Sequence, residues 1–307
     1  YKRQTTRRLQ DERCTKAIDV TFRISGLKPP EALRKIALGA AAIPAACYGS
    51  IWTLPSADSL KRLTTASIRA LYGSKHNLRC PEIMSVLFMD PVRMVPLTAI
   101  VFKNIMDIRR LLLLDTTRRR SFCSNLELAQ ETLLDDVHGP GHGLLSLAKA
   151  INCSIKLSHS ENEIDIVCDD AGRSVSLLST KLPLLKWNLR DFITRSILQG
   201  LMTRLQGTQT RKDMLGITSI IDKNATLSLV TKPYLCDKDT HRVRLALRII
   251  LSGAVMFADR LKAAKLITDD RCDHPECNGA RCTADHWFYE CAKNKKNTLA
   301  LQNELQK

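Results

Sequence analysis

Aromatic side chains are scarce in this sequence, and long apolar runs are missing. Phe, Trp and Tyr make up 5% of the 307 residues. The longest apolar run extends from Ile36 to Cys47 and contains Pro44. It is shorter than the roughly 20 residues that a membrane-spanning helix needs. No secretory signal is recognisable either. We therefore expect a soluble protein that has no membrane partner.

The motifs of several common enzyme classes are also missing. The sequence has no Gly-x-x-x-x-Gly-Lys phosphate loop, no Gly-x-Ser-x-Gly elbow, no His-Glu-x-x-His and no Rossmann glycine triplet. Nothing in it therefore indicates an active site of these kinds. Because it begins with Tyr1 instead of Met, we expect it to be a piece of a longer protein.

Acidic residues are outnumbered by basic ones. The chain has 47 Lys and Arg against 31 Asp and Glu, a formal net charge of +16. Such a charge favours partners with many phosphates, RNA or DNA, over acidic small substrates or a membrane. The hydrophobic content of 44% is ample for a packed core.

The cysteines show no disulfide framework. Their number is odd, eleven, and seven of them are dispersed along the first 240 residues without regular spacing. This pattern is typical of a reducing compartment. We expect an intracellular protein, in the nucleus or the cytoplasm.

Apolar residues recur mainly at helical spacing. The pattern predicts helices over residues 1–28, from Glu31 to Pro44, 58–72, 97–112, 181–205 and 243–264. Two short alternating runs, 164–167 and 174–178, predict a β-hairpin. The expected fold class is therefore mainly α with a small β-hairpin insert.

Residues 121–150 are expected to form a loop with a short helix. A glycine-rich segment at its centre holds His138 and His142. No further ligand-type residues nearby complete a metal site, so the segment is interpreted as a linker. The expected domains are a basic helical region 1–120, the linker 121–150, a helical region with the hairpin 151–265, a metal module 266–296 and a tail 297–307.

Clusters of cations are the candidate nucleic-acid contacts. They are Arg3, Arg7, Arg8, Arg118, Arg119, Arg120, Arg244, Arg248, Lys293, Lys295 and Lys296. A phosphate backbone would be their natural counterpart. The alternative for the arginines at helix ends is a solvated surface favoured by the helix dipole.

The turn of the predicted hairpin contains Asp169 and Asp170. Adjacent aspartates in such a turn hold the metal ions of a polymerase palm. However, no partner strand with a third carboxylate is recognisable upstream, and an Asp-Asp-Ala-Gly turn is ordinary hairpin chemistry. An independent polymerase therefore stays a minor alternative.

The densest group of metal-binding residue types lies near the end of the chain. Four cysteines and two histidines fall between Arg271 and Cys291. Zinc binds four N or S ligands in a tetrahedron. Two pairs with four residues between their members, Cys272 with Cys277 and His286 with Cys291, predict the Zn²⁺ ligands. Cys282 and His274 remain alternative ligands.

The segment from Arg248 to Cys291 resembles the region downstream of the polymerase in non-LTR retrotransposon reverse transcriptases. The resemblance is carried by Ser252-Gly-Ala-Val-Met-Phe-Ala-Asp-Arg-Leu261 and by Ala280-Arg-Cys-Thr-Ala-Asp-His-Trp-Phe-Tyr-Glu-Cys291. Segments 23–29 and 42–49 are similar to the helical thumb that follows the palm in that family. Together these segments cover about a third of the chain.

The resemblance implies a thumb-like helical region and a C-terminal zinc knuckle whose ligands are Cys272, Cys277, His286 and Cys291. The gap between the first two is wider than the family's usual two residues, and Cys282 stands where an acidic residue is common. The family's catalytic aspartates have no counterpart here. The resemblance thus implies a non-catalytic part of an RNA-directed DNA polymerase, whose palm and fingers lie upstream in the parent chain. The alternative is a zinc-containing module that binds proteins and has no nucleic-acid role.

Overall fold

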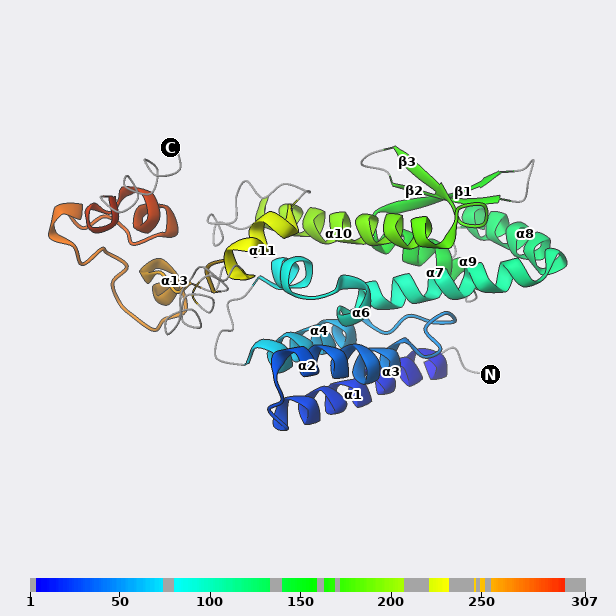
Figure 1. Ribbon diagram of the computed structural model, residues 1–307, viewed down its shortest axis with the longest axis horizontal. Coiled ribbons are helices and arrows are strands. Elements are labelled where there is room, and N and C mark those ends of the chain that lie inside the picture. The colour runs from blue at the N-terminus through cyan, green and yellow to red at the C-terminus, as the bar shows by residue number, and fades with distance from the viewer. Residues whose placement is uncertain are drawn as a thin grey trace. The chain divides into compact units, whose positions relative to one another are not determined.

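The computed structural model describes residues 4–73, 80–132, 140–158, 163–168, 172–206, 221–231, 246, 249–251 and 255–295. The chain divides into two compact units, 1–75 with 81–199 and 76–80 with 200–307. The described part is mainly helical and contains one small antiparallel sheet (Figure 1), which confirms the expected fold class.

The first unit begins with two long helices that pack on each other, α1 (Gln4–Gly26) and α4 (Ala57–Tyr72). Ser56 caps α4 by accepting a hydrogen bond from the Ser59 N–H. Gly73 ends the helix with a φ of 81°, which glycine adopts without strain. Both ends agree with the expected helix 58–72.

The second predicted helix continues through Pro44 instead of stopping there. It consists of α2 (Glu31–Ala37), a π-helical turn η1 (Leu38–Ala42) and α3 (Ile43–Cys47). Pro44 lies in the first turn of α3. It directly follows the π-helical turn, in which the Ile43 N–H donates to the Leu38 carbonyl. The regular i→i+4 hydrogen bonding is thus already interrupted where the missing proline N–H would interrupt it. The expected interruption at Pro44 is therefore wrong.

Three short helical segments connect α4 to the central helix of the first unit. They are α5 (Pro81–Ile83), a π-helical turn η2 (Met84–Phe88) and α6 (Pro91–Met94). The central helix, α7 (Pro96–Leu114), packs against α3, α4, α8 and α9. Its Ile100, Ile105 and Ile108 are almost completely buried. These residues follow the helical spacing that predicted the helix.

The expected linker 121–150 is largely helical. Two helices, α8 (Thr116–Thr132) and α9 (Pro140–Ala150), pack on each other, and α9 also packs on β1. Buried Leu126, Leu144 and Leu147 explain this packing. The boundary between the compact units lies near Gln199 instead. His138 and the side chain of His142 lie outside the described residues.

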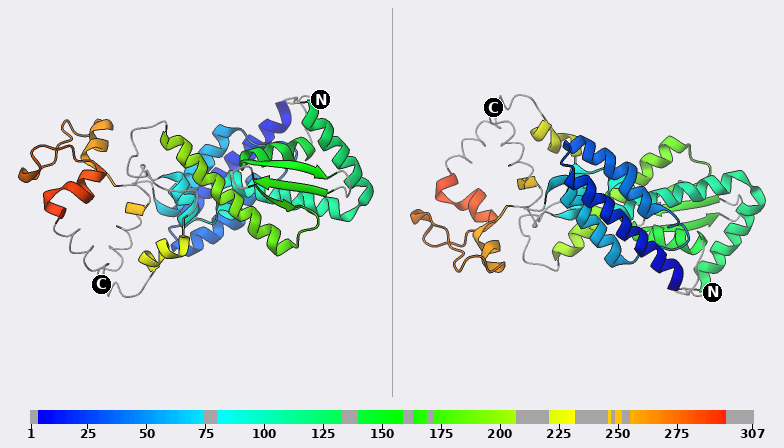
Figure 2. Two further views of the ribbon diagram at one scale, coloured as in Figure 1. Left: turned by 90° about the horizontal axis from the view of Figure 1, so that it is seen from above. Right: turned by 90° about the horizontal axis from the view of Figure 1, so that it is seen from below.

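The sheet has three strands, one more than the hairpin predicted from the sequence. They are β1 (Cys153–Ser158), β2 (Glu163–Cys168) and β3 (Arg173–Ser176), in the order β1-β2-β3 (Figure 2). Ile155 pairs with Ile166, and Ile166 pairs with Val175. All three side chains are buried, so one face of the sheet contributes to the core. Asp169 and Asp170 lie outside the described residues.

Helix α10 (Leu182–Gln206) confirms the long helix expected at 181–205, and α11 (Lys223–Thr231) follows. The last predicted helix, 243–264, is not continuous. Residues 255–257 are not helical, and Phe257 has an extended ψ of 160° before the short α13 (Ala258–Ala263). None of the described helices is both long and apolar enough to cross a membrane.

Candidate metal centre

The first pair of candidate ligands comes from a small hairpin. Arg271 and Arg281 form an antiparallel bridge, and the Cys272 N–H donates to the Ala280 carbonyl at 2.7 Å. The turn begins with a 3-10 helix η4 (Pro275–Cys277) and continues through Asn278 and Gly279, which have φ values of 49° and 71°. Asn and Gly tolerate this left-handed conformation best. The sequence thus folds Cys277 back toward Cys272.

The second pair comes from one π-helical turn. The Thr283 hydroxyl accepts a hydrogen bond from the His286 N–H at the start of this helical segment. The turn itself is η5 (His286–Glu290), and the Cys291 N–H donates to the His286 carbonyl at 2.6 Å. In an α-helix, side chains five residues apart point about 140° away from each other. The wider i→i+5 turn brings His286 and Cys291 closer to one face.

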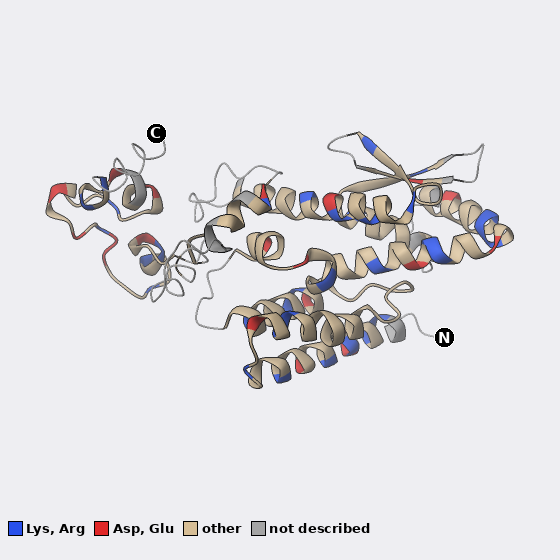
Figure 3. Cartoon of the chain, in the orientation of Figure 1, with Lys and Arg blue, Asp and Glu red and all other residues tan. Residues whose placement is uncertain are grey.

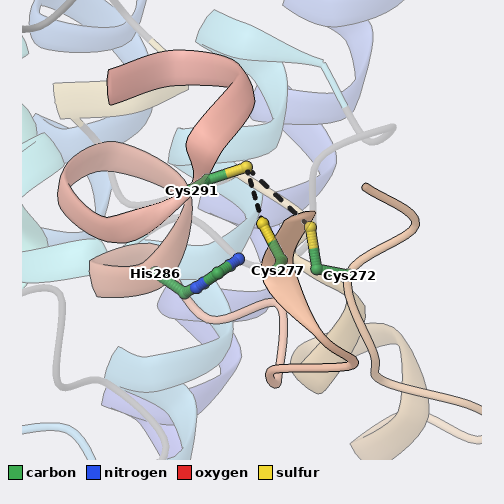
Figure 4. A group of neighbouring side chains, drawn as sticks. All are labelled: Cys272, Cys277, His286 and Cys291. Carbon is green, nitrogen blue, oxygen red and sulfur yellow. Dashed lines mark hydrogen bonds between the residues drawn. The ribbon is translucent and has the colours of Figure 1, made fainter. Parts of the chain in front are cut away.

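The four side chains converge on one point (Figure 4). The Sγ atom of Cys291 lies 3.8 Å from that of Cys272 and 3.8 Å from that of Cys277. All four ligand atoms, including one nitrogen of His286, lie within 4.8 Å of one another. A tetrahedron with metal–sulfur bonds of about 2.3 Å has edges of roughly 3.8 Å. The sulfur positions therefore fit a single tetrahedral ion.

The imidazole of His286 is oriented for ligation. The side chain is buried, and its Nδ1 lies 3.5 Å from Oε2 of Glu290. Its Nε2 is buried and has no hydrogen-bond partner among the described residues. Figure 4 shows the far end of the ring directed toward the thiols. A buried nitrogen without a partner is costly, and a metal ion would remove that cost. The neighbouring carboxylate is typical of metal-bound histidine.

The thiols influence one another's protonation. For Cys291, burial raises the pKa, but backbone N–H groups of Lys293 and Asn294 and the two neighbouring thiols lower it below its usual value. For Cys277, the Ala292 N–H lowers the pKa, but burial and the other two thiols raise it above its usual value. Three thiolates this close repel one another unless a cation lies between them. The donor set is therefore suited to a thiophilic divalent metal such as zinc.

The two alternative ligands lie outside this cluster. Cys282 is held by backbone hydrogen bonds: its N–H donates to the Asp270 carbonyl at 2.7 Å and its carbonyl accepts from the Asp259 N–H at 3.4 Å. Burial raises the pKa of its thiol. His274 precedes η4, and its buried Nδ1 has no hydrogen-bond partner among the described residues. The structure thus groups the four residues that the sequence pairing predicted.

An ionic clamp around Asp270 was not predicted from the sequence. This buried carboxylate lies 2.7 Å from Nζ of Lys262 on α13 and 2.7 Å from Nε of Arg281 on the hairpin. It therefore ties α13 to the hairpin that carries Cys272. Its sequence context, one of two adjacent aspartates, does not distinguish it from the exposed Asp269.

The candidate nucleic-acid contacts are dispersed over several elements. Four of them lie outside the described residues: Arg3, Arg244, Arg248 and Lys296. Among the others, Arg8 pairs with Glu12, Arg118 pairs with Asp115, and the side chain of Arg119 donates to the Leu112 carbonyl. Arg7, Arg120, Lys293 and Lys295 are exposed. Figure 3 shows Lys and Arg interspersed with acidic residues along the described helices.

No disulfide joins the following cysteines of the described part, which are free thiols: Cys14, Cys47, Cys80, Cys123, Cys153, Cys272, Cys277, Cys282 and Cys291. Comparisons with protein-family models, with curated proteins and with solved structures find no match to this chain. The four-residue cluster is accordingly the feature from which a function can be argued.

Proposed function

We propose that this protein binds Zn²⁺ through Cys272, Cys277, His286 and Cys291 and uses its cationic surface to bind RNA or DNA. It would do so as a non-catalytic, C-terminal part of a non-LTR retrotransposon reverse transcriptase. The palm and fingers of that polymerase would lie upstream in the parent chain.

The convergence of the four ligand atoms carries the zinc proposal. Three thiols and one imidazole with sulfur–sulfur spacings of 3.8 Å match the ligand types and the geometry of a closed structural site. Such a site has no open position for substrate, so the ion would stabilise the fold of this region instead of catalysing a reaction. A small module of this kind draws much of its folding free energy from the metal.

The distribution of charge supports the nucleic-acid partner. The exposed Lys293 and Lys295 lie two and four residues after Cys291, exposed Arg271 directly precedes Cys272, and exposed Arg281 lies between the two ligand pairs. A rigid metal module would therefore hold cations in defined positions. The formal net charge of +16 adds long-range attraction to phosphate backbones. The resemblance to the post-polymerase region of retrotransposon enzymes supports an RNA-directed DNA polymerase as the activity of the parent chain.

Two measurements on the full chain test the proposal. Elemental analysis should find one equivalent of zinc, and a chelator should increase hydrogen exchange across residues 255–295. Binding to labelled RNA and DNA should weaken steeply with salt, because each neutralised phosphate contributes about −0.7 to −0.9 to the slope of log K against log salt. A metal-free chain with an unchanged tail would overturn the zinc proposal, and absence of salt-dependent binding would overturn the nucleic-acid proposal.

A protein partner is the second candidate, favoured by exposed apolar side chains on the first unit. Phe22, Leu27 and Ile36 are 57%, 81% and 65% exposed. They lie on or beside α1 and α2. Substituting Phe22 and Ile36 by Ser would weaken a protein complex but leave nucleic-acid binding and its salt slope unchanged. The two candidate functions therefore predict different outcomes for the same variant.

A further inference from the structure

We infer that a pocket beside the metal centre accepts one nucleobase of a single-stranded nucleic acid, with the adjoining phosphate on the cations at its rim. This inference rests on the proposed function, because it assumes a nucleic-acid partner. It goes beyond that function because it assigns a site for an unpaired base. Salt-dependent contacts to the phosphate backbone alone would not require such a site.

The pocket lies between α13 and the metal module and has a volume of about 580 Å³. This is within the range of about 300–1,000 Å³ that is usual for small-molecule sites. Ala258 and Leu261 of α13 form one apolar wall, and Ile267 and the half-buried indole of Trp287 add further apolar surface. Apolar walls that include an indole ring suit the face of a planar heteroaromatic ring.

Several of the remaining lining residues are charged or polar. Arg271 and Lys293 line the pocket, and both are exposed to solvent. Lys293 has no ion-pair partner among the described residues, whereas Arg271 lies 3.9 Å from Asp269. Thr268 and His274 also line the pocket, and Nδ1 of His274 is buried without a hydrogen-bond partner among the described residues. The pocket therefore offers cations and hydrogen-bonding groups beside its apolar walls.

These features favour a nucleotide unit over other ligands. A phosphate alone would use the cations but not the walls formed by Leu261, Ile267 and Trp287. An apolar side chain would leave His274 and Lys293 without partners. A base with its phosphate can use both groups of residues, and stacking on an aromatic side chain tolerates any base. The lining carboxylates Asp269 and Asp273 can accept hydrogen bonds from exocyclic amino groups.

The pocket depends on the metal centre for its shape. Cys272 and Cys291, two of the candidate ligands, belong to its lining. Binding of the ion would hold both thiolates and the backbone around them in place. Base binding should therefore require the zinc-loaded protein.

The test compares two strands on the zinc-loaded full chain. Fluorescence anisotropy measures affinity for a short single-stranded oligonucleotide and for a strand of equal length with abasic sites in place of its internal bases. The intact strand should bind about fivefold more tightly or better, since stacking of one base contributes about 1–3 kcal/mol. Ala258→Phe fills the pocket and should abolish this preference. Ala263→Phe, on the same helix but exposed and outside the lining, should keep it.

A preference that survives in Ala258→Phe overturns the inference. Equal binding of both strands by the wild-type chain also overturns it but leaves the proposed function intact. Absence of binding to either strand contradicts the proposed function itself. Bound zinc is measured in both variants to show that the module is folded.

If Ala258→Phe loses its zinc, Lys293→Gln replaces it, with Lys265→Gln as a control that lies outside the pocket lining. Lys293→Gln should weaken binding of the intact strand more than Lys265→Gln does, and equal effects overturn the inference. A mononucleotide provides the last comparison. If it displaces the strand at the concentration at which the strand itself saturates, the pocket is specific for a free nucleotide and the single-strand inference is wrong.

Discussion

The Sγ atoms of Cys272 and Cys291 lie 3.8 Å apart, although 19 positions separate the two residues in the sequence. One comes from the hairpin and the other follows the π-helical turn η5. Bringing two thiols together from separate elements has a cost in chain entropy. A shared metal ion would offset this cost, because it binds both thiolates.

The first prediction distinguishes a ligand from a neighbouring thiol. Cys291→Ser should lose most of the bound zinc and the protection of residues 255–295 against hydrogen exchange, because the remaining donors cannot complete the tetrahedron. Cys282→Ser is the matched control and should bind one equivalent of zinc with nearly wild-type protection. Zinc content and hydrogen exchange measure both effects. If Cys282→Ser instead loses more zinc and more protection than Cys291→Ser, Cys282 is a ligand.

The second prediction concerns the clamp at Asp270. Hydrogen bonds from Lys262 and Arg281 hold the pKa of this carboxyl below its usual value, so it is ionised at neutral pH. Asp270→Asn removes the negative charge between two cations and should destabilise the packing of α13 on the hairpin. Asp269→Asn changes an exposed neighbour and should have little effect. Limited proteolysis between residues 255 and 275 would show faster cleavage in the first variant, whereas equal rates would contradict the role of the clamp.

The third prediction concerns Asp11, which joins α1 to the start of α4. Its Oδ1 accepts hydrogen bonds from the Ser56 N–H at 2.8 Å and from the Ser56 hydroxyl at 2.9 Å. Burial raises the pKa of Asp11, but the hydrogen bonds from Ser56 and Ser59 and the charge of Arg7 together lower it below its usual value. Asp11→Asn should lower the free energy of unfolding at pH 7 by about 1–2 kcal/mol.

The effect of Asp11 should depend on pH. Because its folded-state pKa is depressed, its contribution is fully present above the unfolded pKa of about 3.9 and is lost as the pH falls through the folded value. The difference between wild type and Asp11→Asn in urea midpoint should therefore shrink on acidification. Asp19→Asn on the exposed side of the same helix is the control. A difference that is constant over this pH range would be inconsistent with an ionised acceptor.

The fourth prediction tests the arginines at the start of α8. Replacing Arg118, Arg119 and Arg120 by Gln should reduce the steepness of the salt dependence by up to about 0.7–0.9 for each phosphate that the variant no longer neutralises. The matched control replaces Lys61, Arg62 and Arg69, three exposed cations of α4, by Gln. Anisotropy titrations at several salt concentrations measure the slopes. Equal slopes in the two triple variants would indicate that the arginines of α8 form a solvated helix end.

The sequence alone determined the helical class and the four clustered donors. Apolar residues at helical spacing predicted α1, α4, α7 and α10, because burial of one face stabilises a helix wherever the chain packs. The density of cysteine and histidine between residues 271 and 291 predicted the cluster, because few other roles require so many ligand-type residues in so short a segment. Both predictions depend only on residues that are close to one another in the sequence.

Only the tertiary structure decided how these local patterns are used. Helices α8 and α9 form where a linker was expected, because Leu126, Leu144 and Leu147 find a core to pack in. Cys282 was excluded from the cluster by its place in the hairpin, and His286 was brought into it by a π-helical turn. The spacing of residues along the chain does not determine in which direction these side chains point. These directions depend on which backbone hydrogen bonds form once separate segments, such as α13 and the hairpin, are packed together.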